Sequence, residues 1–128
     1  MILDTNALSA IADDEQEAVR LFRDAPSIEL PAIVLGEYRF GIAQSRRRKD
    51  YEKWLAELIA ATRVLPVDEG TTSHYAQVRS ELKKQGKPIP SNDLWIAASC
   101  RQHGLPLMSQ DRHFDAVSGV KRIRWVSS

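Results

Sequence analysis

The chain has 128 residues, 43% of them hydrophobic and 27% charged, and its formal net charge is +1. This length and composition predict one globular domain over residues 1–128, and the near-neutral charge neither requires nor excludes a nucleic-acid partner. The apolar runs are too short to cross a bilayer, the start lacks a signal-peptide pattern, and the lone Cys100 fits a reducing environment, so we expect a cytoplasmic protein with no membrane partner.

Short apolar segments alternate with helical patterns in the first half of the chain. Strands are expected at 1–4 and 27–30, and helices at 7–12, 15–24, 32–43 and 47–62. The segment 32–43 is apolar almost all round, which predicts a helix that is buried on most sides. An apolar stripe from Tyr51 to Ile59 on the next helix is expected to pack on the core, with a partner surface as the alternative.

The second half of the chain continues this alternation. Strands are expected at 64–67, 107–109 and 122–126, and helices at 69–84 and from an N-cap at Ser91 to about His103. Strands that alternate with helices predict an α/β domain with a mainly parallel sheet. Ligands of such sheets gather beyond the carboxyl ends of the strands, where Asp4 and Asp111 occur.

Four acidic residues are set against apolar segments: Asp4, Glu37, Asp93 and Asp111. Taken singly, the three aspartates have an ordinary alternative as caps of turns or helix starts. The alternative for Glu37 is a surface position or a partner such as Arg39 or Arg79, but a carboxylate within an apolar helix is costly, so a functional role is favoured. Taken together at the end of one sheet, each pair would repel by roughly 3 kcal/mol at ~5 Å and an effective dielectric constant of ~20. The chain has no comparable set of Lys or Arg, so a bound metal ion is the leading explanation.

Carboxylate oxygens favour Mg²⁺ or Mn²⁺ over zinc as the bound ion. The three histidines are scattered and are expected to be surface or core residues, with His113 the nearest to the site. Further residues are expected to orient the carboxylates or waters: Thr5, Asn6, Ser109 and Asp115. For Asp115, a solvated position in a loop is the alternative.

These segments, taken in order, resemble the PIN-domain nucleases, particularly the VapC toxins of bacterial toxin–antitoxin pairs. The resemblance rests on Ile2–Asn6, Glu37, Asn92–Ala98 and Ser109–Phe114. Two positions depart from the family pattern. Ser109 stands where the family usually has Thr, and His113 stands where many relatives carry another Asp. The second departure leaves Asp111 and Asp115 as candidates for the last acidic contact, with Asp111 favoured.

The resemblance implies an α/β/α sandwich with a short, mainly parallel central sheet. It further implies an Mg²⁺- or Mn²⁺-dependent endoribonuclease that hydrolyses RNA with a metal-activated water, in which Asp4, Glu37 and Asp93 bind the metal and Asp111 completes the site. A cognate antitoxin and a homodimer are implied as well. The alternatives are a metal-dependent DNA or flap nuclease and a non-catalytic module that only binds RNA or a partner protein.

Cations are expected to hold RNA beside an acidic site. The candidates are the run Arg46, Arg47, Arg48 and Lys49, together with Arg112 and the lysines Lys83, Lys84 and Lys87. A solvated helix face is the alternative for the run, since most charge runs are solvated. Contacts to phosphates would make RNA binding depend on salt.

Overall fold

A short parallel sheet lies at the centre of the computed structural model, which describes residues 1–126. Its strands stand in the order β3-β2-β1-β4-β5, and each neighbouring pair is parallel. The strands are β1 Ile2–Leu3, β2 Glu29–Pro31, β3 Arg63–Leu65, β4 Leu107–Met108 and β5 Arg122–Ile123. Because β1 is the middle strand, Asp4, the residue that follows it, lies at the centre of the carboxyl edge of the sheet.

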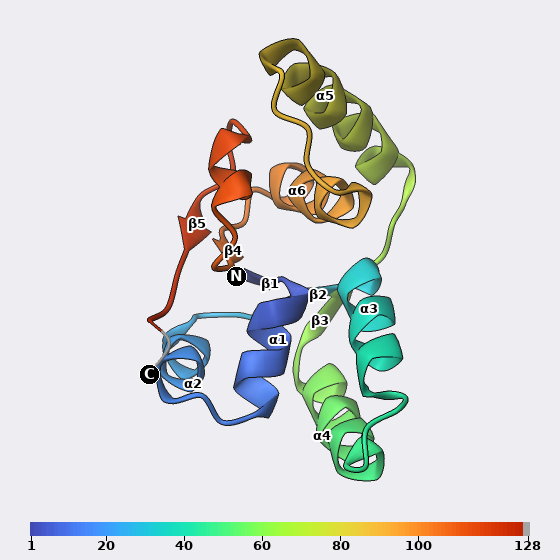
Figure 1. The fold of residues 1–128 in the computed structure, drawn as a ribbon, viewed down its shortest axis with the longest axis vertical. Helices are drawn as coiled ribbons and strands as arrows, with labels where there is room; N and C mark the ends of the chain where they lie inside the picture. The colour runs from blue at the N-terminus through green and yellow to red at the C-terminus, as the bar shows by residue number, and fades with distance from the viewer. Residues whose placement is uncertain (127–128) are drawn as a thin grey trace.

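Helices follow the strands and lie around the sheet (Figure 1). They are α1 Thr5–Ala12, α2 Gln16–Asp24, α3 Ala32–Ile42, α4 Arg48–Ala61, α5 Glu69–Gln85, α6 Ser91–His103 and the 3-10 helix η1 Arg112–Ala116. Helices α5 and α6 pack together above the strands in the view of Figure 1, while α3 and α4 form a helical hairpin below them. The expected α/β fold with a short parallel sheet is confirmed.

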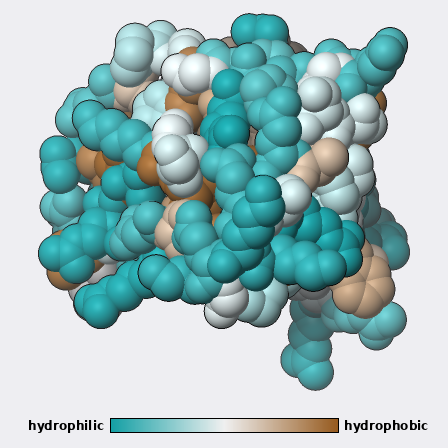
Figure 2. All heavy atoms as spheres, turned by 90° about the horizontal axis from the view of Figure 1, so that it is seen from above, coloured by the Kyte–Doolittle hydropathy of each residue, from teal (hydrophilic) through white to brown (hydrophobic). Residues whose placement is uncertain are grey.

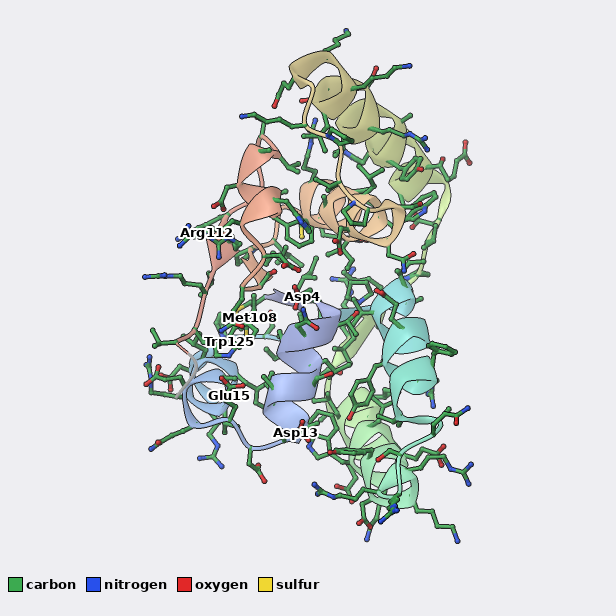
Figure 3. All side chains as sticks on the ribbon, viewed as in Figure 1. Asp4, Asp13, Glu15, Met108, Arg112 and Trp125 are labelled. Carbon is green, nitrogen blue, oxygen red and sulfur yellow. The ribbon has the colours of Figure 1, made fainter. Side chains whose placement is uncertain are left out.

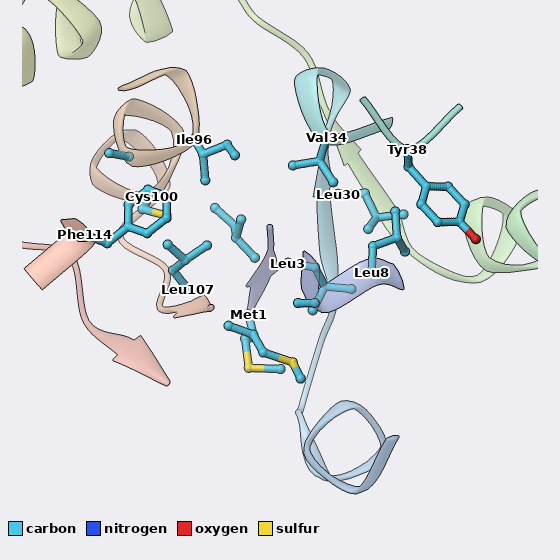
Figure 4. Packing of buried hydrophobic residues seen from close by; sticks show 14 of the residues in the cluster. Met1, Leu3, Leu8, Leu30, Val34, Tyr38, Ile96, Cys100, Leu107 and Phe114 are labelled. Atoms are coloured by element: carbon cyan, nitrogen blue, oxygen red, sulfur yellow. The ribbon is translucent and has the colours of Figure 1, made fainter. Parts of the chain in front are cut away.

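The core is formed by apolar side chains of the strands and of the inner faces of the helices (Figure 4). Leu3, Leu30 and Leu107 from three strands are fully buried. The stripe on α4 packs on this core through the buried Leu55 and Leu58, so the core interpretation of that stripe is confirmed. Polar side chains dominate the face shown in Figure 2. None of the helices in residues 1–126 is long and apolar enough to cross a membrane.

Two expectations about the helices are wrong. Ser91 is the first residue of α6 rather than its N-cap, because the extended Pro90 precedes the helix and caps it without a side-chain hydrogen bond. Helix α3 is not buried on most sides. It buries Val34, Tyr38 and Ile42 along one face and leaves Phe40 84% exposed on another.

Candidate active site

Asp4 links the middle strand to the first helix. Its backbone N–H donates to the Met108 carbonyl of β4, and its Oδ1 accepts a hydrogen bond of 2.8 Å from the Ala7 amide, which caps α1. The side chain lies where β1 passes into α1 (Figure 3) and the residue is only 3% exposed. Thr5 and Asn6 form the first turn of α1, which therefore begins two residues before the expected helix at 7–12.

Burial is the main reason that the pKa of Asp4 rises to about 6. The nearby carboxylates of Asp111 and Asp93 raise this pKa further, while hydrogen bonds from the Ser109 hydroxyl and the Ala7 amide lower it. Asp4 thus lies within electrostatic reach of two other acids that are distant in the sequence.

Glu37 reaches the same region from α3. Its Oε1 accepts a hydrogen bond of 2.9 Å from the Thr5 hydroxyl, and its Oε2 accepts one of 3.0 Å from the Asn92 side-chain amide. These partners come from the starts of α1 and α6 and are neutral, so they orient the carboxylate without cancelling its charge. The sequence suggested Arg39 or Arg79 as ordinary ion-pair partners, and neither is the partner of Glu37 among the described residues.

Asp93 lies in the first turn of α6, where the helix dipole favours a negative charge. Its Oδ2 is 2.9 Å from Nε2 of His113, although the ring N–H is not aligned for a hydrogen bond. The pKa of Asp93 is raised, mainly by burial; His113 lowers it, and Asp111 and Glu37 raise it. The expectation that His113 is the histidine nearest to the site is confirmed, but it is not an ordinary surface or core residue, because one turn of η1 brings its ring against Asp93.

Asp111 enters the site from the loop after β4. Its backbone N–H donates to the hydroxyl of the fully buried Ser109, the residue whose hydrogen bond also lowers the pKa of Asp4. Ligand atoms of Asp93, Asp111 and His113 all lie within 4.8 Å of one another. Three groups at this spacing are close enough to bind one cation.

Asp115 lies apart from this cluster. Its exposed carboxylate accepts two hydrogen bonds from Arg122, and the same guanidinium donates to the Ser109 carbonyl. Within residues 1–126, the hydrogen bonds of Asp115 connect it to the site through Arg122 and the backbone of Ser109, and Asp115 also lines a cavity with His113. Asn6 is exposed on the first turn of α1.

The donor set fits a divalent cation. Among the described residues, no Lys or Arg forms an ion pair with Asp4, Glu37, Asp93 or Asp111, and the raised pKa of Asp4 reflects a buried carboxylate that lacks a cation. Hard oxygen donors of this kind suit Mg²⁺ or Mn²⁺. The imidazole of His113 adds one nitrogen donor to the set.

Most of the candidate cations line three separate cavities. Lys87 and Arg112 line a cavity of about 480 Å³ together with Asp115 and with His113, whose ring lies against Asp93. Arg46, Arg47, Arg48 and Lys49 line a separate hollow of about 440 Å³ at the turn between α3 and α4. Figure 1 shows this turn at the end of α3 that lies away from the strands. Lys83 lines a third cavity, between α5 and the start of α6.

Comparison with known proteins decides the family. The family model described as the PIN domain matches residues 1–120. The chain belongs to the PIN-domain family. Among curated PIN-domain relatives, it is 34% identical to Toxin FitB of Neisseria gonorrhoeae, with 87% of each chain covered. It is 36% identical to VapC ribonuclease Y4jK of Sinorhizobium fredii, with 87% of this chain and 86% of the relative covered.

Solved structures with the PIN-domain fold superpose closely on this chain. FitAcB from Neisseria gonorrhoeae matches with a TM-score of 0.81 and 30% identity, over 95% of each chain. VapBC2 from Rickettsia felis, bound to a DNA fragment from its promoter, matches with a TM-score of 0.86 over 98% of each chain. That match has 21% identity and bears on the fold alone.

The sequence places His113 near this PIN-domain site without giving it a role, and it gives no sign of Arg122. The place of His113 depends on the direction of η1, for which the sequence offers no periodic pattern. Arg122 starts the edge strand β5, and only the strand order brings it beside Ser109. The departure from Asp at position 113 was the one signal that pointed to His113.

Proposed function

We propose that this chain is a divalent-metal-dependent endoribonuclease, the toxin of a toxin–antitoxin pair. One observation carries the proposal: acids from four separate segments come within electrostatic reach of one another, and among the described residues none of them forms an ion pair with Lys or Arg. Relatives that are 30% and 36% identical over most of their length are named ribonucleases, which supports RNA as the substrate.

In this proposal Asp4, Glu37 and Asp93 bind the ion, and Asp111 completes the site. The ion, when bound, supplies Lewis-acid stabilisation of the phosphodiester and lowers the pKa of the attacking water. The chain's own contribution is to hold the ligands still: Thr5 and Asn92 fix Glu37, and Ser109 fixes Asp4 and the backbone before Asp111. Asp115 supports the same loop through Arg122.

Either Mg²⁺ or Mn²⁺ is proposed as the ion. Mg²⁺ prefers oxygen ligands in near-octahedral geometry, whereas imidazole nitrogen is more acceptable to transition metals. A site that offers three or four carboxylates and the nitrogen of His113 therefore accommodates Mn²⁺ as well as Mg²⁺.

RNA is proposed to reach the acids along the cavity that Lys87 and Arg112 line. Neutralised phosphates release counterions, so binding should weaken as salt rises. The run Arg46 to Lys49 is a second candidate for contacts to the strand, at a greater distance. Replacing Arg46, Arg47 and Arg48 together should reduce the salt dependence of binding if these residues contact phosphates.

A cognate antitoxin that blocks the site, a homodimer and a cytoplasmic location complete the proposal. FitB and VapC5 are named as a toxin and a ribonuclease, and solved structures of such relatives are toxin–antitoxin complexes. These are properties of the relatives, and they make an antitoxin the first partner to seek for this chain.

Cleavage of matched RNA and DNA strands tests the proposal. The wild-type chain with Mg²⁺ or Mn²⁺ should cut RNA and leave 5′-phosphate and 3′-hydroxyl ends, and Asp4→Asn should not cut. Products with 2′,3′-cyclic phosphate would contradict the metal mechanism. Preferential cutting of the DNA or of a flap would favour the DNA nuclease instead, and RNA binding without cutting in either metal would favour the non-catalytic module.

A further inference from the structure

A second cavity begins at the acidic centre and leads away from it along α1. Its volume is about 250 Å³, and its walls come from α1, α3 and the start of α4. Thr5 and Glu37 line one end, while Asp13 and Tyr51 line the other. Asp4 and Asp13 mark the two ends of α1 in Figure 3, so the cavity follows most of this helix. A chemical group bound in this cavity would therefore lie next to a substrate group held at the acidic centre.

The Tyr38 hydroxyl gives this cavity an unused polar group. Tyr38 lines the cavity and is only 3% exposed, and within residues 1–126 its hydroxyl has no hydrogen-bond partner. In Figure 4 the hydroxyl points away from Leu8 and Leu30, out of the apolar cluster. A buried hydroxyl without a partner is costly, and a ligand that pairs with it removes that cost.

A fixed aromatic ring and a cation stand at the far end of the cavity. The Tyr51 hydroxyl donates to Asp13, which holds the ring in place. The Arg47 guanidinium lies over this ring, 5.0 Å from its centre, and its backbone N–H donates to the Ser45 hydroxyl. Arg47 belongs to the run of cations at the turn between α3 and α4. The phosphate of an RNA strand at this end of the cavity would therefore lie near positive charge.

We propose that this cavity binds one base of the RNA strand, next to the phosphodiester that is cut. The Tyr38 hydroxyl pairs with the polar edge of the base, and Arg47 contacts the phosphate beyond it. Proteins commonly recognise single-stranded RNA by such splayed bases, with aromatic side chains and hydrogen bonds to base edges. This inference rests on the proposed ribonuclease function and assigns a determinant of its sequence preference.

A base suits this cavity better than a protein segment does. The volume of about 250 Å³ is slightly below the range of ligand pockets, about 300–1,000 Å³, which suits a single heterocycle rather than a larger ligand. Its lining is rich in hydroxyl and carboxylate groups, which match the donors and acceptors of a base edge. Glu37 lines one end of the cavity, and Arg47 lies over Tyr51 at the other end, so an RNA strand that passes through would run from the acids to a cation.

Gly41 allows the cavity to be filled without disturbing the fold. It lines the cavity from α3, and an added Cβ would meet nothing within 4 Å. Gly41→Leu therefore projects a side chain into the cavity, and replacing a helix-interior glycine should not weaken α3. Gly36 has equally open surroundings on the same helix and does not line the cavity, so Gly36→Leu is the matched control.

The test is cleavage of a single-stranded RNA pool with a randomised stretch, followed by sequencing of the cut ends. Wild type should show a base preference at one position beside the cut. Gly41→Leu should flatten that preference and slow cleavage at least tenfold, whereas Gly36→Leu should retain both. Tyr38→Phe keeps the ring and removes the hydroxyl, so the preference at the same position should fall about 2- to 10-fold.

The possible failures are distinguishable. If wild type and Gly41→Leu cut the pool with the same preference and rate, the inference is overturned and the ribonuclease proposal stands. If Gly41→Leu leaves cleavage unchanged and weakens binding of the antitoxin, the cavity belongs to a protein partner and the inference is again overturned. If the wild-type chain cuts no RNA in either metal, both proposals fail together.

Discussion

Two buried carboxylates on neighbouring strands have opposite surroundings. Glu29 begins β2 and is 5% exposed, and it is paired with the Met1 ammonium and accepts a hydrogen bond from the Ser27 hydroxyl. Asp4 follows β1 at the other edge of the sheet, equally buried, and has acids as neighbours instead. Burial raises the pKa of Glu29, but its ammonium and hydroxyl partners outweigh burial and hold the pKa below its ordinary value, whereas the pKa of Asp4 rises to about 6.

This difference separates a structural carboxylate from a candidate ligand. A buried charge with its partner inside the fold is satisfied by folding itself. A buried charge without one lowers the stability of the chain until an ion arrives from outside. The carboxylate of Glu29 therefore stabilises the fold at one edge of the sheet, whereas the carboxylate of Asp4 can bind a cation at the other.

The largest expected effect comes from removing the ligand charge at Asp4. Asp4→Asn should lower kcat/KM for RNA cleavage by at least about 100-fold, because a metal ligand should matter no less than the residues that support one. Isothermal titration with Mn²⁺ should show metal binding weakened in parallel. Glu29→Gln, which changes a buried carboxylate far from the centre, is the control. Full activity of Asp4→Asn would remove this residue from the mechanism.

The free energy of unfolding should change in opposite directions in the two variants. Glu29→Gln should cost about 3 kcal/mol of unfolding free energy, because the Met1 ammonium then stays buried without its counter-charge. Asp4→Asn should instead stabilise the metal-free chain at pH 7 by up to about 3 kcal/mol, since two pKa units of penalty disappear. Urea unfolding in EDTA measures both. If both variants are destabilised alike, the two carboxylates do not differ in the way described.

The pH dependence of stability provides a sharper comparison. The pKa of Asp4 is raised from 3.8 to about 6, so the folded chain binds the extra proton and stability falls as pH rises between these values. The pKa of Glu29 is lowered, so its contribution is present above its ordinary value of 4.5 and is lost as pH falls through the folded pKa. In EDTA, the Asp4→Asn variant should not lose stability as pH rises from 3.8 to about 6, and the Glu29→Gln variant should not show the loss of stability at low pH that comes from Glu29.

Saturating Mg²⁺ or Mn²⁺ should also remove the Asp4 slope, because the ion supplies the missing positive charge. Metal affinity itself should decline as pH falls below about 6, where Asp4 takes up a proton. A slope that persists in saturating metal would show that Asp4 does not contact the ion.

The smallest effect is expected at His113. His113→Asn removes the only nitrogen donor of the cluster, so Mn²⁺ affinity should fall about tenfold more than Mg²⁺ affinity. Isothermal titration with each ion in the absence of RNA measures this, with Arg112→Ala as a neighbouring control that leaves the donor set intact. Equal losses for the two metals would assign His113 to orienting Asp93 rather than to the ion.

Much of the fold was predictable because the apolar patterns are strong. Alternating segments gave the parallel sheet, and the positions of Asp4 and Asp111 after strands gave the edge on which they lie. The partners of Glu37 were harder to predict, because Thr5 and Asn92 approach it only after α1, α3 and α6 pack. The exposure of Phe40 was missed for a similar reason: its neighbours in sequence are apolar, and only packing decides which face of α3 is covered.

The hydrogen bond between Oδ1 of Asp4 and the Ala7 amide has one more consequence. It fixes one carboxylate oxygen of Asp4 at the start of α1. The side chain therefore loses its rotational entropy during folding, and binding of the ion does not carry that cost. An incoming cation then meets an oxygen that already points in one direction, which should favour rapid capture and a narrow choice of coordination geometry.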